Sequence, residues 1–395
     1  MGKIYPFRRI LFITTVTLVF FAFTSVTHTQ QDNFQFHSSD KAYSTLTYDS
    51  SIANPPKTGA ELYKKACANC HGADGKGTST TQLGLEVAPP DFTECNFATR
   101  EPDGDWIAIA HQGGPTRGFS KEMPAFGKAL SERDLKKIMD HLRTFCTDDN
   151  WPRGELNLPR PLVTEKAYPE DEAVFSTSID MENEGAVNNE IVYERRFGAR
   201  NQLEIVFPFG YTQQRNGGWS GGHLGDMALG VKRTLYHNLN SGSIFSLTGE
   251  VIVPTGDEAT RYGIGTTVLE PFASYGQILP RGGFFHLQTG LEYPLLRDKA
   301  EDEAFWRAAI GKSFNPIPWG RTWSPMVEIL GSREIESGAV TQWDIAPQMQ
   351  VTLNTRQHIM LNIGVRIPAD DPERDTQLMV YILWDWFDGG IFEGW

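Results

Sequence analysis

The sequence has no long apolar run after residue 26, although 40% of its 395 residues are hydrophobic. Each membrane-crossing helix needs about 20 mostly apolar residues, so a helical protein with several membrane spans is excluded. An excess of positive charge is also absent, because 36 Lys and Arg oppose 49 Asp and Glu, a formal charge of −13. This balance argues against nucleic acid as a partner. Neither deficit excludes a membrane β-barrel, whose strands carry their apolar residues in alternation.

Residues 1–29 have the layout of a secretory signal peptide. Lys3, Arg8 and Arg9 form a positively charged start, and residues 10–26 form an apolar stretch before a polar run. No pair of small residues marks a clear cleavage site, so an uncleaved anchor is the alternative. An exported chain enters an oxidising compartment, and its cysteines are interpreted accordingly.

Cysteine is scarce, with four in the whole chain, and two of them lie in one motif. Residues 67–71 read CANCH, the C-x-x-C-H pattern of covalent haem attachment. Two thiols three residues apart on a helical turn can reach both vinyl groups of one porphyrin, and the adjacent histidine can bind the iron. No second C-x-x-C is present to favour a zinc site. We therefore predict one covalent haem c held by Cys67, Cys70 and His71.

Met123 is the candidate for the second axial iron ligand. It opens the stretch MPAFG, whose proline favours an extended loop, and a thioether there would raise the reduction potential of haem iron. His111 is the alternative ligand. Its place just before Gly113 and Gly114 favours instead the end of a helix, where a histidine complements the helix dipole. We predict His71 and Met123 as the metal ligands and assign no catalytic residue.

Two helix starts near this motif carry capping signals. Thr58 and Glu61 form a capping box before a helix that ends at the haem motif, and Ser131 with Asp134 begins a last helix that runs to about residue 145. The apolar face of that last helix is expected to pack across the first helix near Tyr63.

Residues 55–147 resemble a class I cytochrome c domain in these motifs, and also in Pro89-Pro90-Asp91-Phe92 and the Gly113-Gly114 turn. The resemblance implies an all-α domain that transfers one electron through a low-spin haem, with periplasmic redox proteins as partners. Cys95 and Cys146 remain after the haem pair is assigned. In an exported domain two such thiols suggest a disulfide, and two separate thiols are the alternative.

The pattern changes from about residue 171, where segments of about ten residues alternate apolar and polar side chains. Residues 358–367 show it best, with Ile359, Leu361 and Ile363 on one face and Asn362 on the other. About twelve such segments follow, starting near residues 173, 189, 201, 224, 243, 266, 283, 303, 322, 343, 357 and 376. An even number suits a closed antiparallel β-barrel with both termini in the periplasm.

The polar face and the strand ends favour a transmembrane barrel over a soluble sandwich or barrel. A water-filled lumen tolerates inward charges that a packed core does not, and aromatic residues gather at membrane interfaces. The charged positions are Glu204, Asp226, Lys232, Glu250, Glu292, Arg307, Glu328, Asp344 and Arg366. The aromatic positions are Trp306, Trp319, Trp323, Trp343, Trp384, Trp386 and Phe387.

Short motifs at residues 224–232 (LGDMALGVK) and 253–257 (VPTGD) resemble the outer-membrane barrel family named for the meta-pathway of phenol degradation. That resemblance covers roughly residues 170–395 and implies contact with outer-membrane lipid. Residues 148–170 carry four prolines and are expected to form a stiff linker. The predicted order is a signal peptide (1–29), a cytochrome c domain (55–147), a Pro-rich linker (148–170) and an outer-membrane β-barrel (171–395).

These parts predict an electron carrier whose haem domain lies in the periplasm, tethered to the outer membrane by a porin-like barrel. The alternative is an outer-membrane channel for small, including aromatic, molecules, with the cytochrome serving a partner oxidoreductase. An enzyme with its own substrate is less favoured. Iron bound by Met123 has no open position, and no nucleophile or paired carboxylates stand out.

Overall fold

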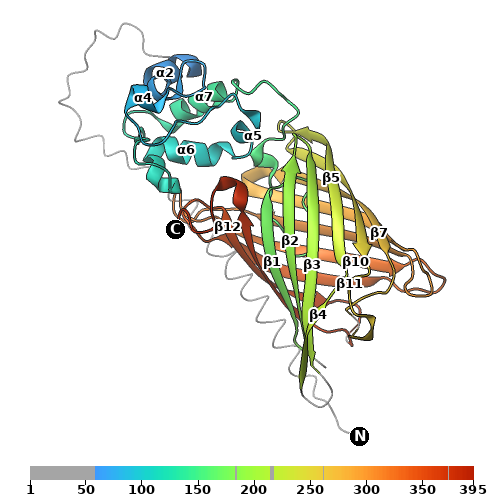
Figure 1. Ribbon diagram of the computed structural model, residues 1–395. Coiled ribbons are helices and arrows are strands. Elements are labelled where there is room, and N and C mark those ends of the chain that lie inside the picture. The colour runs from blue at the N-terminus through green and yellow to red at the C-terminus, as the bar shows by residue number, and fades with distance from the viewer. Residues whose placement is uncertain (1–57, 183–184, 214–217, 261, 372) are drawn as a thin grey trace, which may run out of the picture. The chain divides into compact units, whose positions relative to one another are not determined.

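The computed structural model describes residues 58–182, 185–213, 218–260, 262–371 and 373–395, and Figure 1 shows their elements. The predicted signal peptide lies outside the described residues. Residues 56–395 form one compact unit. Among the described residues, no helix is both long and apolar enough to cross a lipid bilayer.

The N-terminal part of this unit is helical, as predicted. Its helices are α2 (Gly59–Ala66), α3 (Ala68–His71), α4 (Thr80–Leu83), α5 (Cys95–Ala98), α6 (Asp103–Gln112) and α7 (Glu132–Leu142), with a 3₁₀ turn η1 (Gly114–Arg117). The capping box is confirmed, because the Glu61 amide donates to Thr58 Oγ1 over 3.2 Å and the Thr58 amide donates to Glu61 Oε2 over 3.1 Å. Ser131 caps α7 through the Asp134 amide. Helix α7 ends at Leu142, slightly earlier than expected.

Helices α2 and α7 cross at close range. A Cβ atom added at Gly59 would lie 2.0 Å from the carbonyl oxygen of Lys137, so only glycine permits this approach. The Tyr63 ring packs edge-on against the rings of His141 and Phe145. The predicted packing of the last helix near Tyr63 is confirmed, and it forms the core of the helical part.

Cys95 and Cys146 form a disulfide, with 5.1 Å between their Cα atoms. The bond joins the start of α5 to the chain just after α7. Cys67 and Cys70 remain free thiols. The disulfide therefore closes a loop of sequence separation 51 that contains α6 and α7.

We predict that Cys95→Ser with Cys146→Ser destabilises the helical part by about 2–4 kcal/mol, because the unfolded chain gains the freedom of an open loop. Chemical denaturation followed by haem absorbance would measure the change in the full chain. A reductant should lower the stability of the native chain to that of the variant and leave the variant unaffected. Equal stability of the native chain and the variant without reductant would contradict the prediction.

The C-terminal part is a β-sheet closed into a barrel. Its strands are β1 (Glu172–Asp180), β2 (Ala186–Phe197), β3 (Asn201–Gln213), β4 (Trp219–Leu224), β5 (Met227–Asn238), β6 (Ser243–Val253), β7 (Val268–Leu279), β8 (Gly283–Pro294), β9 (Glu303–Lys312), β10 (Trp323–Glu334), β11 (Gln342–Thr352), β12 (Ile359–Pro368) and β13 (Gln377–Asp385). The observed starts lie close to the predicted ones, except that the short strand β4 was not foreseen.

The ring closes because β1 pairs with both β2 and β13, while β3 pairs with both β2 and β5. All of these pairings are antiparallel, and the remaining strands follow in sequence order. Strand β4 pairs with β3 alone and stands outside the ring, which therefore has the predicted twelve strands. The tightest turns between neighbouring ring strands are 198–200, 239–242 and 280–282, and all lie at the end where β1 begins.

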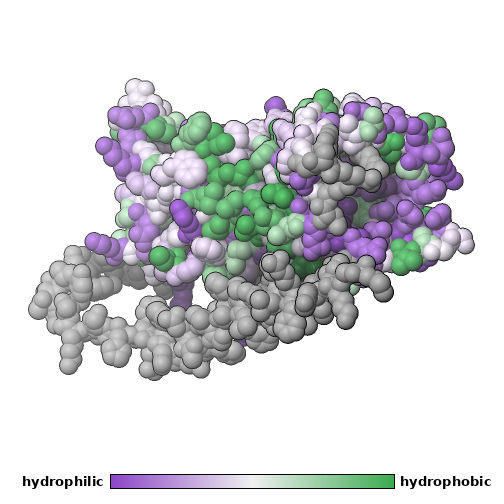
Figure 2. All heavy atoms as spheres, turned by 90° about the horizontal axis from the view of Figure 1, so that it is seen from below, coloured by the Kyte–Doolittle hydropathy of each residue, from purple (hydrophilic) through white to green (hydrophobic). Residues whose placement is uncertain are grey.

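The outer face of the barrel is apolar. Exposed aliphatic side chains recur on alternate positions of the strands, for example Leu229, Leu247, Leu287, Ile329 and Ile363. On the face shown in Figure 2, hydrophobic side chains gather in the middle and hydrophilic ones lie toward the ends. Of the predicted aromatic residues, Trp323, Trp343 and Trp384 lie at strand ends and Trp386 just beyond one, whereas Trp319 lies in the connection between β9 and β10. Trp306 packs against Trp343, and Tyr193 stacks on Trp386.

The inner face of the barrel is polar, but its lumen is not simply filled with water as expected. Residues 157–171, here called the lumen segment, bond to inward-facing side chains all around the ring. The amides of Leu162, Val163 and Thr164 donate to the carboxylate of Glu328. Further partners are Glu172 on β1, Glu194 on β2, Gln202 on β3, Thr234 on β5, Ser246 on β6, Gln288 on β8, Gln348 on β11, Asn362 on β12 and Tyr381 on β13.

Some of the charged groups within the barrel are paired through this segment. Arg160 forms ion pairs of 2.7 Å with Glu172, 2.9 Å with Glu194 and 2.9 Å with Glu165. Lys166 lies 3.0 Å from Glu172. The predicted stiff linker does join the helices to β1 along the chain, yet most of its length is buried inside the barrel rather than solvated.

Four of the predicted inward charges, Glu204, Lys232, Glu328 and Asp344, are buried within the ring. Asp226 is different, because it lies in the break between β4 and β5. Its carboxylate accepts from the amides of Gly256 and Ile264 and so fixes a loop rather than lining a strand.

Candidate haem site

The C-x-x-C-H motif lies where α2 gives way to α3. Cys67 is the residue between the two helices, and the amides of Cys70 and His71 both donate to its carbonyl oxygen. Gly72 then ends α3 with a φ of +76°, a conformation that other residues adopt only with strain. This tight turn holds both thiols and the imidazole on one short piece of backbone.

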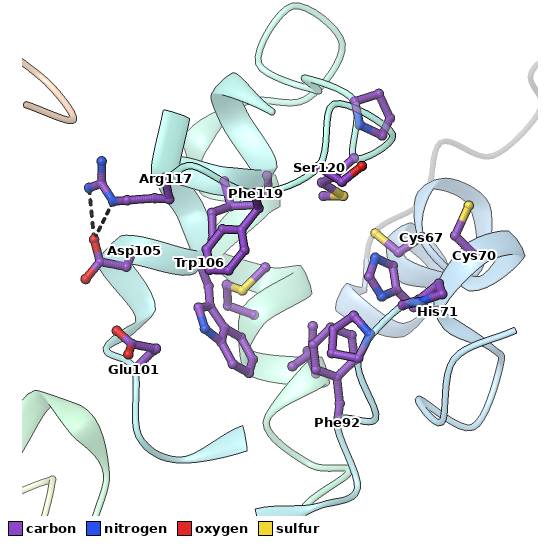
Figure 3. A pocket seen from close by; sticks show the side chains of 18 of the residues that line it. Cys67, Cys70, His71, Phe92, Glu101, Asp105, Trp106, Arg117, Phe119 and Ser120 are labelled. Carbon is purple, nitrogen blue, oxygen red and sulfur yellow. Dashed lines mark hydrogen bonds and ion pairs between the residues drawn. The ribbon is translucent and has the colours of Figure 1, made fainter. Parts of the chain in front are cut away.

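The four residues predicted to bind the haem line one cavity of about 390 Å³ in the helical part. Cys67, Cys70, His71 and Met123 share this cavity, whose other walls are mostly apolar; they include Leu85, Val87, Phe92, Phe97, Ile109 and Ile138. Figure 3 shows Cys67, Cys70 and His71 at one end and Glu101, Asp105 and Arg117 at the other, with Trp106 and Phe119 between them. The fold thus brings together the predicted residues, although Met123 lies far from the other three in the sequence.

His71 is a buried imidazole whose surroundings favour its neutral form. Its ring stacks on Phe92 with centroids 5.0 Å apart, and its Nδ1 atom is buried without a hydrogen-bond partner. Burial lowers the pKa of His71, which favours the neutral form that binds iron. Burial, followed by the neighbouring Cys70, raises the pKa of the Cys67 thiol to about 11.

Met123 lies in a loop fixed to the end of α6. Its carbonyl oxygen accepts from the Gly114 amide over 3.0 Å, and its amide donates to the Ser120 carbonyl over 3.2 Å. The amides of Phe126 and Gly127 donate to the carbonyls of Ala110 and His111 at the end of α6. These bonds give the thioether a defined place in the cavity wall.

His111 lies in the last turn of α6, as the favoured interpretation predicted. It is not among the residues that line the cavity. Its ring lies 5.6 Å from the ring of Trp319, and a Cβ atom at Gly127 would lie 2.5 Å from it. These contacts use the imidazole for packing. A second methionine, Met139 of α7, does line the cavity and was missed in the sequence.

The far end of the cavity is charged. Arg117 donates to Asp105 Oδ1 over 2.9 Å, and it is held further by the Trp319 carbonyl over 2.8 Å. Desolvation raises the pKa of Asp105, although the ion pair with Arg117 opposes that shift. Desolvation and the nearby carboxylates of Asp388 and Asp105 raise the pKa of Glu101 well above its usual range. The thiols and the imidazole at the other end, together with the apolar walls, are the residues that would hold a covalent haem.

Residues from the barrel also line this cavity. Arg356, from the connection between β11 and β12, and Phe387 and Asp388, just after β13, stand in its wall. Periodicity and motifs relate residues within one element, so no signal in the sequence joins residue 356 to residue 67.

Residues 54–142 match the family described as cytochrome c oxidase, cbb3-type, subunit III. The helical part is therefore a cytochrome c-type domain, which confirms the coarser half of the sequence prediction. The match does not extend to the barrel. A search of curated proteins finds no match to the chain.

Solved structures similar to this chain include the KdgM porin in complex with disordered oligogalacturonate, with 9% identity and a TM-score of 0.36 over 54% of this chain and 98% of that chain. The NanC porin has 8% identity and a TM-score of 0.37 over 54% and 97%. The beta domain of the Bordetella autotransporter BrkA has 13% identity and a TM-score of 0.35 over 54% and 97%. The predicted resemblance to the phenol-degradation barrel family is not confirmed.

We predict that Met123→Ala leaves haem attached but yields a high-spin or water-ligated spectrum, because the thioether is lost. Met139→Leu is the matched control, since it removes a second sulfur from the same cavity. Optical spectra of the full chain would distinguish them. An unchanged spectrum for Met123→Ala would contradict the assignment, favouring Met139 if its variant changes and His111 if it does not.

Proposed function

We propose that this protein is an electron carrier with one covalent haem c, bound through Cys67 and Cys70 and ligated by His71 and Met123. The observation that carries the proposal is that these four side chains, from two distant segments, line one largely apolar cavity. A haem held there supplies one-electron oxidation and reduction of its iron. The chain's own residues exclude water around it, because Phe92, Phe97 and Ile138 form the walls.

The barrel serves, in this proposal, to tether the haem domain at the outer membrane. The outward aliphatic side chains and the aromatic strand ends match a surface that contacts lipid. A closed ring leaves no unpaired strand edge, which hydrocarbon surroundings require. The tightest turns lie at the end where β1 begins, and outer-membrane barrels place their short turns in the periplasm. Because the helical part leads into β1 at this end, the position of the turns supports a periplasmic haem domain, with periplasmic redox proteins as its partners.

The second candidate is a channel for small, including aromatic, molecules through the barrel. The lumen segment argues against it, because Arg160, Thr164 and Lys166 are buried in the ring and bonded to its wall. A solute would have to displace these contacts. The structure therefore favours the tether over the open channel.

Fractionation tests the proposal directly. The full chain should be found with outer membranes, resist carbonate extraction, migrate anomalously when unheated and stain for haem in the same band. Cys67→Ser with Cys70→Ser should lose the haem stain and keep the membrane behaviour, since the barrel does not depend on those thiols. A soluble haem-staining chain would refute the tether. A membrane-bound chain without covalent haem would refute the electron carrier.

Conductance in a planar bilayer separates the two candidates. The native chain should conduct little, whereas replacing residues 157–167 with a Gly/Ser segment of equal length should open the lumen, because the buried bonds to the wall are lost. Heat-modifiable migration and haem staining would confirm that the variant still folds. Steady conductance by the native chain, equal to that of the variant, would favour the channel.

A further inference from the structure

Arg356 lies at the contact between the barrel and the haem domain, and hydrogen bonds occupy every nitrogen of its guanidinium. It donates to the carbonyls of Asp388 over 2.7 Å and Gly118 over 3.0 Å, and to Glu393 Oε2 over 2.9 Å. Its Nε also reaches the Arg117 carbonyl at 3.4 Å. Because the guanidinium is planar and held by Asp388 and Glu393, its bonds to the carbonyls of residues 117 and 118 determine where that turn lies relative to the barrel.

The turn at residues 117–119 is enclosed by the barrel's connection and C-terminal tail. The Arg356 guanidinium lies 4.4 Å from the centre of the Phe119 ring. Gly118 has a φ of +69°, and a Cβ atom there would lie 2.7 Å from Gly394 Cα. The Gly394 carbonyl in turn accepts from the Thr355 amide over 2.6 Å. Only a glycine in this turn permits so close an approach of the tail.

The same turn is bonded to the Met123 loop. The Phe119 amide donates to the Gly114 carbonyl over 3.0 Å, and the Gly114 amide donates to the Met123 carbonyl over 3.0 Å. A Cβ atom at Gly114 would lie 2.1 Å from the Ser120 carbonyl oxygen and 3.3 Å from Met123 Cβ. Residues 113–123 therefore form one closely packed loop. Arg356, Phe119 and Met123 all line the cavity that holds His71.

We infer that Arg356 is a positioning residue for Met123, so that the barrel stabilises the thioether as an axial ligand of the haem. The inference rests on the proposed haem ligation and adds to it a role for the barrel beyond tethering. Arg356 fixes residues 117–119, their bonds fix Gly114, and Gly114 fixes the backbone of Met123. Loss of the guanidinium frees the turn and lets the thioether leave the iron more often.

Competition with exogenous imidazole measures this effect in the full chain. Imidazole binds the iron only when Met123 is displaced, so its half-saturating concentration reports the stability of the thioether bond. Arg356→Gln should lower that concentration by about tenfold or more, the effect of losing one charge-assisted hydrogen bond. The half-saturating concentration for Arg356→Lys should lie between those of Arg356→Gln and the native chain. Lysine keeps the positive charge but lacks the planar group that donates several hydrogen bonds at once.

Arg366→Gln is the matched control. Arg366 also belongs to the barrel, on β12, but donates to Asp344 over 2.7 Å away from the haem cavity. Its variant should bind imidazole as the native chain does. Equal half-saturation in Arg356→Gln and the native chain, or an equal shift in Arg366→Gln, would overturn the inference.

A second variant and a check on the native chain complete the test. Where Arg356→Gln fails to assemble, Glu393→Gln replaces it, because Glu393 is more than half exposed and accepts from Arg356 Nη1. A smaller shift in the same direction supports the inference, and no shift overturns it. Failure of the proposed function is seen separately in the native chain alone, as absent covalent haem or a spectrum indifferent to Met123→Ala.

Discussion

The polar inner face of the closed barrel is the constraint on which the rest of the structure depends. Twelve strands with apolar outer faces must turn their other faces inward, and those faces carry Glu194, Lys232 and Glu328 among many polar groups. The lumen segment pairs with part of this wall from within, through Arg160 with Glu194 and through three consecutive amides on Glu328. Breaking a buried ion pair by removing one partner costs about 3–5 kcal/mol, so wall and segment form one structural unit.

The helical part depends on the same stretch of chain, because its last bonds lead into that segment. The Gly154 amide donates to the Thr99 carbonyl over 2.7 Å, and the Tyr168 hydroxyl donates to the Pro152 carbonyl over 3.2 Å. Arg100 of the helical part pairs with Asp171 at the start of the barrel. Hydrogen bonds and an ion pair thus hold the connection between the two parts in one conformation. An electron-carrying site in the helical part would therefore keep a fixed position relative to the barrel.

Much of this structure could be predicted from the sequence because its signals are local. Helix caps at Thr58 and Ser131 and the spacing of Cys67, Cys70 and His71 each involve a few neighbouring residues. Strand alternation is also local, and it placed the ring strands closely. The lumen segment could not be predicted this way, since proline-rich stretches suit both a solvated linker and a buried strap, and only the ring reveals the difference. Arg356 carries no pattern at all, because its partners in the helical part, Arg117 and Gly118, lie more than two hundred residues away.

The lumen segment enters and leaves the barrel at one mouth, since β1 begins at the same end as the tight turns. Within the part of the chain that the structure describes, no segment is therefore threaded through the ring, in keeping with the rarity of knotted topologies. The strands can close first and receive the segment afterwards, or close around it, without a folded domain passing between them. The helical part and the ring of strands can accordingly fold at separate times.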